Sequence, residues 1–543
     1  MRRILARPIV HVVLLALVTA MIVFPNLGAT SLWDDDEGVN AECTREMMEA
    51  GTWIVPTFNW DLRTAKPILL YWLMRLSYSA FGVTEWAARL PSAVMMFAIV
   101  LLTYDLGRRM FGSRTGLLAG FITVSTLELV KLAHAVTTDS TLIAMTVLYF
   151  WVFWRGVTEG GRGWFIPCGI VSGLAMLAKG PAVGLILPSA VVIGYFGWNR
   201  ELRRLFDGRM IWGVLAWILV AAPWYILAAT ETKGEWPRAF FLNENLGRAS
   251  EPMENHRGIP VLYEFVVVCL FFAPWSAFLA VTVWNAWKSR GERSVRILML
   301  WVGIYFLACA AARTKLPNYI APAYPALAIL TAKFFVQWMR GECLPPWWAI
   351  RAGIVGVLLT GIVVTGAMVL ADGGWLTLSP KLRAFPGLGD WAWIGIIPVI
   401  GGGLMNYFRR GDNRGGVVAS LTASSVLFVG FLAAFPVLEV DKRKAVKWLV
   451  EESGARQLDR EVRVASFEFT RPSLTFYVGR RVERFSDPAN AAEFLSIPVE
   501  SYLFIPQPAW DGKVKALVTT RHQILARRYD YDRHYEVLVV TNR

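Results

Sequence analysis

The chain has 543 residues, of which 55% are hydrophobic, and its formal net charge is +14 at pH 7. Soluble domains are about 45–50% apolar, whereas apolar runs of roughly 16–24 residues, long enough to cross a bilayer, recur along most of this chain. The basic residues lie in short loops between these runs and form no continuous face, which argues against nucleic-acid binding. The five cysteines show no CxxC spacing and predict neither a disulfide framework nor a zinc site. The composition therefore predicts a polytopic membrane protein.

The first apolar segment, residues 9–24, follows Arg2, Arg3 and Arg7. A signal peptide would look similar, but no small-x-small cleavage site fits and further apolar runs follow, so we interpret it as an uncleaved first helix. Further spans are predicted at residues 86–107, 115–130, 140–154, 163–178, 181–198, 210–229, 261–287, 297–312, 316–339, 352–371, 391–408 and 416–436. The total is about thirteen transmembrane helices.

Residues 67–82 are apolar but short, and Arg75 lies in their middle. If this segment does not span, the arginine-rich loops all fall on the side of Arg2 and Arg3, as the positive-inside rule requires. We therefore predict an interfacial helix at residues 67–82, with Arg75 on its wet face. This topology places the N-terminus in the cytoplasm. It places residues 31–85, the shorter loops at 131–139, 230–260, 313–315 and 372–390, and the tail from residue 438 outside.

The tail differs in character from the rest of the chain. Residues 461–469, 501–505 and 537–540 resemble strands, and residues 445–452 and 491–495 resemble short helices. The sequence therefore predicts a membrane domain over residues 1–437 and a soluble periplasmic α/β domain over residues 438–543. The basic, aromatic stretch 527–531 is interpreted as a solvated strand edge in preference to a contact with an anionic acceptor.

Four consecutive carboxylates, from Asp34 to Glu37, follow the first apolar segment. Charges of this kind are excluded from hydrocarbon and must lie at the membrane–water boundary. Taken alone, the stretch fits a helix cap, because acidic residues favour a helix N-terminus. The other outer loops, however, also carry many charged and aromatic residues, whereas the cytoplasmic loops hold mostly arginine. Lysine and arginine bind phosphate oxygens, and a nearby carboxylate can act as a general base.

A series of short motifs follows one another along the chain between residues 31 and 325. They are Asp36-Glu37 with Ala41-Glu42, Arg45-Glu46-Met47-Met48, Trp53-Ile54-Val55-Pro56, Lys66-Pro67 with Tyr71-Trp72, Asp139, Leu177-Ala178-Lys179-Gly180-Pro181, Pro223-Trp224, Asn243-Glu244-Asn245 with Arg248, His256-Arg257, Pro274-Trp275, and Lys315-Leu316-Pro317-Asn318-Tyr319-Ile320 with Pro322. This set resembles the bacterial aminoarabinose transferases of lipid A, which belong with the protein O-mannosyltransferase-like GT-C glycosyltransferases.

The resemblance implies a mainly α, polytopic GT-C protein that moves a sugar, aminoarabinose or similar, from undecaprenyl phosphate to a periplasmic-face acceptor such as lipid A phosphate. It marks Asp36 as the catalytic carboxylate, with Glu37 as its supporting partner and Asp139 as a further catalytic candidate. Candidates for binding the donor phosphate are Lys66, Arg257, Lys179, Arg248 and Lys315. Further candidate site residues are Arg63, Asp61, His256 and Tyr319.

Two positions depart from the family pattern. Ala65 stands where the family usually has a Glu before its Lys-Pro, so a divalent metal bridged by that Glu and His256 is disfavoured. Asn318 stands where the aminoarabinose transferases commonly have Thr, which leaves the sugar and the acceptor open. No cofactor is required, because the donor is already activated, and the chain shows neither a GxGxxG motif nor a P-loop.

Two other functions share part of this pattern. A lipid or sugar transporter would need paired broken helices near the bilayer midplane, related by an internal repeat, whereas the ionisable residues here gather at one surface. An O-glycosyltransferase acting on protein or another glycan would share the fold and Asp36. In each enzymatic alternative the protein lies in the bacterial inner membrane, and its partners are the polyprenyl donor, the acceptor and membrane lipid.

Overall fold

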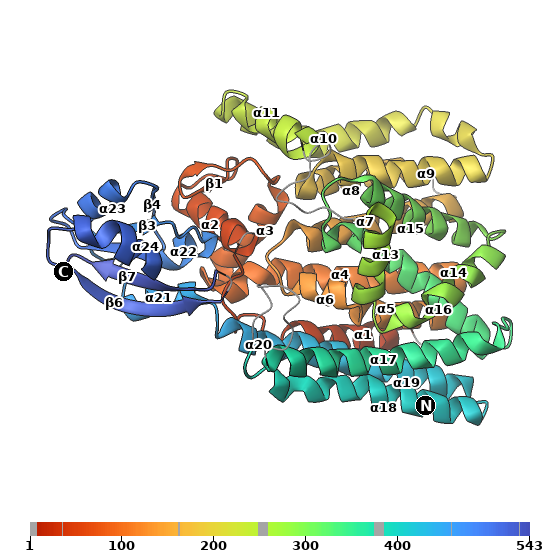
Figure 1. Cartoon of the computed structure of the whole chain (residues 1–543). Coiled ribbons are helices and arrows are strands. Elements are labelled where there is room, and N and C mark those ends of the chain that lie inside the picture. Colours follow the sequence, from red (N-terminus) through yellow and green to blue (C-terminus); the bar gives the residue numbers. More distant parts are fainter. Residues whose placement is uncertain are drawn as a thin grey trace.

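The computed structural model describes residues 8–34, 36–160, 163–247, 259–373, 385–457, 459–531 and 533–543. A bundle of long helices makes up most of the molecule, and a smaller domain with a β-sheet sits at one end of it (Figure 1). The first outer loop, with helices α2 (Asp36–Glu49) and α3 (Leu69–Phe81), lies between the two parts. Its position follows from its sequence, because a polar, charged loop is excluded from hydrocarbon while its apolar residues still need a surface to pack against.

Within the described residues, eight helical segments are long and apolar enough to cross a membrane. They are α4 (Glu85–Phe111), α7 (Thr138–Thr158), α10 (Met210–Glu231), α15 (Arg293–Ala311), η6 with α16 (Pro317–Met339), α17 (Trp347–Asp372), η7 with α18 (Gly389–Arg410) and α19 with α20 (Arg414–Asp441). Three shorter apolar segments are α1 (Pro8–Val23), α8 (Phe165–Lys179) and η1 with α9 (Ala182–Trp198).

Two further segments are sharply bent. Helix α5 (Ser113–Val124) meets α6 (Leu127–Ala133) at 62°, and Val261–Phe271 of α13 (Pro260–Phe271) meets Trp275–Lys288, which contains α14 (Leu279–Lys288), at 116°. Every span predicted from sequence coincides with one of these straight, short or bent segments. How many of them cross the membrane stays a prediction.

The first outer loop contains α2 (Asp36–Glu49), a hairpin of β1 (Thr57–Phe58) and β2 (Asp61–Leu62), and α3 (Leu69–Phe81). Helix α3 has 13 residues and, at 1.5 Å per residue, is too short to cross a bilayer. Its Arg75 does not simply face water, because the guanidinium donates to the carbonyls of Met47 and Thr52 and lies 4.0 Å from the ring centre of Trp53. Arg75 thus ties α3 to the end of α2.

The C-terminal part is an α/β domain, as predicted. Its sheet has the order β4-β3-β5-β7-β6, with β3 (Arg463–Phe467), β4 (Val482–Phe485) and β5 (Ser501–Pro506) parallel. β7 (Tyr535–Thr541) runs antiparallel to β5, and β6 (Gln523–Asp530) forms the edge beside it. Its longer helices are α21 (Ala445–Ser453), α22 (Pro472–Val478) and α23 (Pro488–Phe494).

The strands β3, β5 and β7 and the helices α21 and α23 were predicted from sequence, whereas β4 and α22 were not, and only the end of β6 was predicted, as a strand edge. Stretch 527–531 overlaps the edge strand β6, as predicted, and Arg528 there pairs with Glu452 of α21.

The α/β domain shares an apolar core with the first outer loop. Leu32, Ala41 and Tyr78 of the loop are buried in one cluster with Leu449 and Tyr477 of the α/β domain. Burying apolar surface across this boundary stabilises the junction by about 25 cal/mol per Å². The two parts are therefore packed together and are not joined only by a linker.

Candidate active site

The acidic stretch places its carboxylates in different surroundings. Asp36 begins helix α2 and is exposed, whereas Glu37, in the same turn, is 3% exposed. Both residues line a cavity of about 490 Å³, together with Lys131 of α6 and Asn318 of η6 (Pro317–Ala323). We call this space the acid cavity. Asp36 is thus accessible to a ligand in the cavity, while most of the Glu37 side chain lies within the protein.

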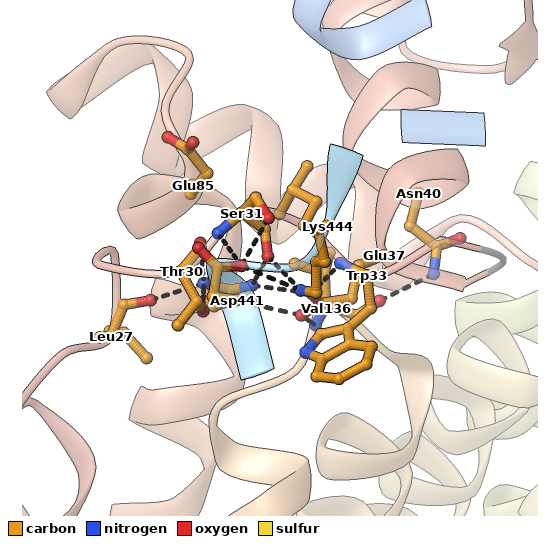
Figure 2. Close-up of polar contacts among 12 residues, drawn as sticks. Leu27, Thr30, Ser31, Trp33, Glu37, Asn40, Glu85, Val136, Asp441 and Lys444 are labelled. Carbon is orange, nitrogen blue, oxygen red and sulfur yellow. Dashed lines mark hydrogen bonds and ion pairs between the residues drawn. The ribbon is translucent and has the colours of Figure 1, made fainter. Parts of the chain in front are cut away.

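Glu37 forms a buried ion pair with Arg89 of α4, with 2.8 Å between Oε2 and Nη2. Arg89 also donates to the carbonyls of Leu27, Thr30 and Ser31 at 2.9–3.0 Å. Figure 2 shows these three residues together on one side of Glu37. Burial raises the pKa of Glu37, but the charge and hydrogen bonds of Arg89 together with the N–H groups of Trp33 and Val136 outweigh that effect, so the net pKa lies below its ordinary value. The pair fixes the chain leading to Asp36.

Glu37 also connects this loop to the one that carries Asp139. Its Oε1 accepts from the backbone N–H of Val136 at 2.8 Å, and its Oε2 accepts from the N–H of Trp33 at 2.8 Å. One turn along α2, the Asn40 amide donates to the carbonyl of Val136 at 2.9 Å (Figure 2). Both backbone polar groups of Val136 are therefore bound by α2, and Asp139 follows three residues later.

Asp139 is 4% exposed and lies in the first turn of α7. One carboxylate oxygen forms a close ion pair with Lys179 of α8, and the other accepts from the Asn318 amide at 2.8 Å. The charges of Lys66 and Asp36 both act on this pair. The fold thus brings together five residues that are spread along the sequence from position 36 to position 318.

Lys66 and Lys179 line a second cavity, of about 310 Å³, which we call the lysine cavity. Tyr319 lines it too, and the Lys179 ammonium lies 5.1 Å from the centre of its ring. Most of the remaining lining is apolar and includes Leu142, Ile186 and Phe240. Since Asn318 lines the acid cavity and Lys179 lines the lysine cavity, Asp139 connects one residue of each.

Other predicted site residues lie elsewhere. Lys315 is 3% exposed, and its ammonium donates to the carbonyls of Cys309 and Ala310, at the end of α15, at 2.7 and 2.8 Å. Asp61 is exposed on β2, and neither it nor Arg63 lines either cavity. Arg248, His256 and Arg257 lie outside the described residues. The roles predicted for all these residues stay predictions.

The metal prediction can be tested only on the residues present. Ala65 lines the lysine cavity but offers no ligand atom. Within the described part of the chain, no group of three or more His, Cys, Asp or Glu side chains is arranged to hold a metal ion. Because His256 lies outside the described residues, the statement that a metal is disfavoured stays a prediction.

Arg89, Asn40 and Val136 were not predicted as site residues. A signal for Arg89 does exist, because a lone arginine one turn inside an apolar span needs a buried partner. No comparable signal marks Asn40 or Val136, whose contact joins two loops 96 residues apart.

Known proteins resemble this chain both in sequence and in fold. A family model described as dolichyl-phosphate-mannose-protein mannosyltransferase matches residues 65–226. The structure of ArnT from Cupriavidus metallidurans bound to undecaprenyl phosphate superposes with a TM-score of 0.80, at 22% identity over 98% of both chains. The chain therefore has the fold of that structure over nearly its whole length.

Curated sequences agree with this likeness. The undecaprenyl phosphate-α-4-amino-4-deoxy-L-arabinose arabinosyl transferase 2 of Proteus mirabilis is 32% identical over 60% of this chain and 60% of its own length. The corresponding transferase of Erwinia tasmaniensis is 28% identical over 67% of this chain and 66% of its own length. An uncharacterised Aquifex aeolicus protein is 30% identical over 59% of this chain and 63% of its own. The chain thus matches less than two thirds of the length of each relative.

Proposed function

We propose that this chain transfers a sugar, 4-amino-4-deoxy-L-arabinose or a close relative, from undecaprenyl phosphate to an acceptor at the periplasmic face of the bacterial inner membrane, with lipid A phosphate as the acceptor. The observation that carries the proposal is the pairing of two cavities. One holds the cations Lys66 and Lys179 among apolar walls, and the other holds the exposed carboxylate Asp36. Curated relatives with the same named activity support it.

The lysine cavity suits the donor. Lys66 and Lys179 can bind the phosphate oxygens by charge-assisted hydrogen bonds, while the apolar lining suits the isoprenoid next to the phosphate. In the reaction, the bond between the sugar C1 and the phosphate oxygen breaks, and undecaprenyl phosphate leaves with additional negative charge. Cations already in place stabilise that developing charge more than they stabilise the ground state.

The acid cavity suits the acceptor, whose oxygen forms the new bond to the sugar C1. If that oxygen belongs to a phosphate, it is already ionised, and Asp36 orients the acceptor or stabilises positive charge on the sugar. If it belongs to a hydroxyl, Asp36 accepts its proton. Asp139 contacts Lys179 of the lysine cavity and Asn318 of the acid cavity, and so holds the donor-binding cation at a fixed position relative to the acceptor.

The substitution Asp36→Asn tests this assignment. We expect it to abolish sugar transfer in purified protein while leaving undecaprenyl phosphate binding intact, because Asp36 lines the acid cavity and the lysines line the other. Glu49→Gln is the matched control, since that carboxylate is exposed at the far end of the same helix. Full activity in Asp36→Asn would refute the assignment.

The acceptor is tested separately in cells with and without the protein. Mass spectrometry should show a lipid A population that carries the extra sugar only when the protein is present. Modification of a periplasmic protein with lipid A unchanged would instead support the O-glycosyltransferase alternative and refute the proposed acceptor.

A further inference from the structure

The residues from Ser31 to Asp34, which precede Asp36 in the chain, are held by interactions with the C-terminal domain. The N–H and hydroxyl of Ser31 donate to Asp441 at 2.9 and 2.6 Å, and its carbonyl accepts from Lys444 at 2.8 Å. Figure 2 shows Asp441 and Lys444 on either side of Ser31. The next residue, Leu32, donates its N–H to the hydroxyl of Tyr477 at 2.7 Å. These contacts restrain the backbone itself.

Helix α22 binds the acidic end of the same segment. Asp34 accepts from the hydroxyl and the N–H of Ser473 at 2.6 and 3.2 Å, so the carboxylate caps the first turn of α22. Arg471 lies 3.5 Å from Asp34 and is fixed in turn by Asp530, at 2.7 Å. Asp34 is therefore held by two side chains of the α/β domain.

Close packing adds to these hydrogen bonds. Gly38 lies directly against α22, where an added Cβ would come within 2.7 Å of the backbone nitrogen of Ser473 and 2.9 Å of its Cα. Ser473 is 1% exposed and Tyr477 is 7% exposed, so neither contact is screened by water. The segment bearing Asp36 is thus bounded on both sides, at Asp34 and at Gly38, by one short helix.

We infer that the C-terminal domain acts as a positioning element for transfer, in which Ser473 and Tyr477 fix the backbone that carries Asp36. The inference rests on the proposed role of Asp36. Asp36 is exposed in its cavity, and no hydrogen bond of the described side chains orients it in the way that Lys179 and Asn318 orient Asp139. Its placement therefore depends on the backbone, and a shift of about 1 Å can lower a rate by 100-fold.

The test uses the full chain with two substitutions that each delete one hydroxyl, Tyr477→Phe and Ser473→Ala. Each has a matched control in the same domain that also loses a hydrogen-bonded hydroxyl. Tyr502→Phe removes the contact to Glu500, and Ser501→Ala removes the contact to the Val499 carbonyl. Both of these hydroxyls are bonded within the α/β domain, to Val499 and Glu500.

Two measurements are made on every variant. Hydrogen exchange of the peptide covering residues 27–38 should rise in Tyr477→Phe and Ser473→Ala but not in the controls. The kcat for sugar transfer should fall by about 10- to 100-fold in the same two variants, with the KM for the donor unchanged. Ser473→Thr, which keeps the hydroxyl, should restore both values.

The outcomes separate this inference from the proposed function. Raised exchange with unchanged kcat would show that the contacts only join the domains, and unchanged exchange would show that they do not restrain the segment. Either result overturns the positioning role. A parent protein that binds undecaprenyl phosphate but transfers no sugar would instead refute the proposed function, whatever the exchange experiment shows.

Discussion

Replacing Arg89 by methionine would remove the cation that binds the buried Glu37 carboxylate. Arg89 is 1% exposed and Glu37 3%, so water cannot replace the lost contact. Besides both carboxylate oxygens, the guanidinium binds the hydroxyl of Thr30 at 3.0 Å and the carbonyls of Leu27, Thr30 and Ser31. The substitution therefore leaves one charge and several polar groups buried and unpaired.

Breaking a buried ion pair by removing one partner costs about 3–5 kcal/mol. We expect Arg89→Met to lower the free energy of unfolding by about that amount, measured by reversible unfolding in mixed detergent micelles. Adding Glu37→Leu should recover part of the loss, because the charge is then gone, although the N–H groups of Trp33 and Val136 still lose their acceptor. Their loss leaves a cost of about 1–3 kcal/mol each.

Arg108→Met provides the matched control on the same helix. Arg108 also pairs with a carboxylate, Asp105, but its side chain is 30% exposed, so the expected cost is below about 1 kcal/mol. A loss in Arg89→Met no larger than in this control would refute the reasoning. So would strictly additive effects of Arg89→Met and Glu37→Leu, because residues in direct contact should couple by about 0.5–3 kcal/mol.

Two further predictions concern the donor and pH. Lys66→Ala should weaken undecaprenyl phosphate binding about 10- to 100-fold, since a charged hydrogen bond contributes about 1.5–3 kcal/mol. Lys513→Ala on the α/β domain is the control. Normal binding by Lys66→Ala would exclude Lys66 from the donor site. Because the folded-state pKa of Glu37 is lowered from 4.5, its stabilising effect is fully present above pH 4.5 and is lost as the pH falls through the lower folded-state value. The stability of Glu37→Gln should depend less on pH in that acid range, and an unchanged slope would contradict this.

Sequence reasoning identified the membrane segments and much of the α/β domain because those signals are local. An apolar run of span length or an alternating strand can be recognised without knowing what it packs against. Strand β4 (Val482–Phe485) was missed because it is short and mostly polar, with Glu483 and Arg484 in its middle. Its place in the sheet comes from pairing with β3, a contact that no local pattern reveals.

Part of the candidate site was proposed from sequence motifs and not from local hydrophobic patterns. Asp36, Lys66, Asp139 and Lys179 stand in motifs that resemble those of a known family, and the fold places Asp36 and Lys66 where their charges act on the pair of Asp139 and Lys179. Lys315 belongs to the same motifs, but its ammonium binds carbonyls at the end of α15 (Arg293–Ala311), a geometry that a motif cannot convey. The contacts of the C-terminal domain were unpredictable for a further reason, because Leu32 and Tyr477 are 445 positions apart.

The neighbouring carboxylates Asp36 and Glu37 show why position within a helix matters more than residue type here. Successive side chains on a helix point about 100° apart, so if Glu37 turns inward to Arg89, Asp36 must point elsewhere, and it lies exposed in the acid cavity. Exchanging the two residues would keep the composition and the charge, yet it would place the shorter carboxylate beside Arg89 and leave the longer one unrestrained in the cavity. The ion pair of Glu37 with Arg89 therefore sets the direction of Asp36. The contacts of the C-terminal domain to Leu32 and Asp34 restrain the same short segment of the chain.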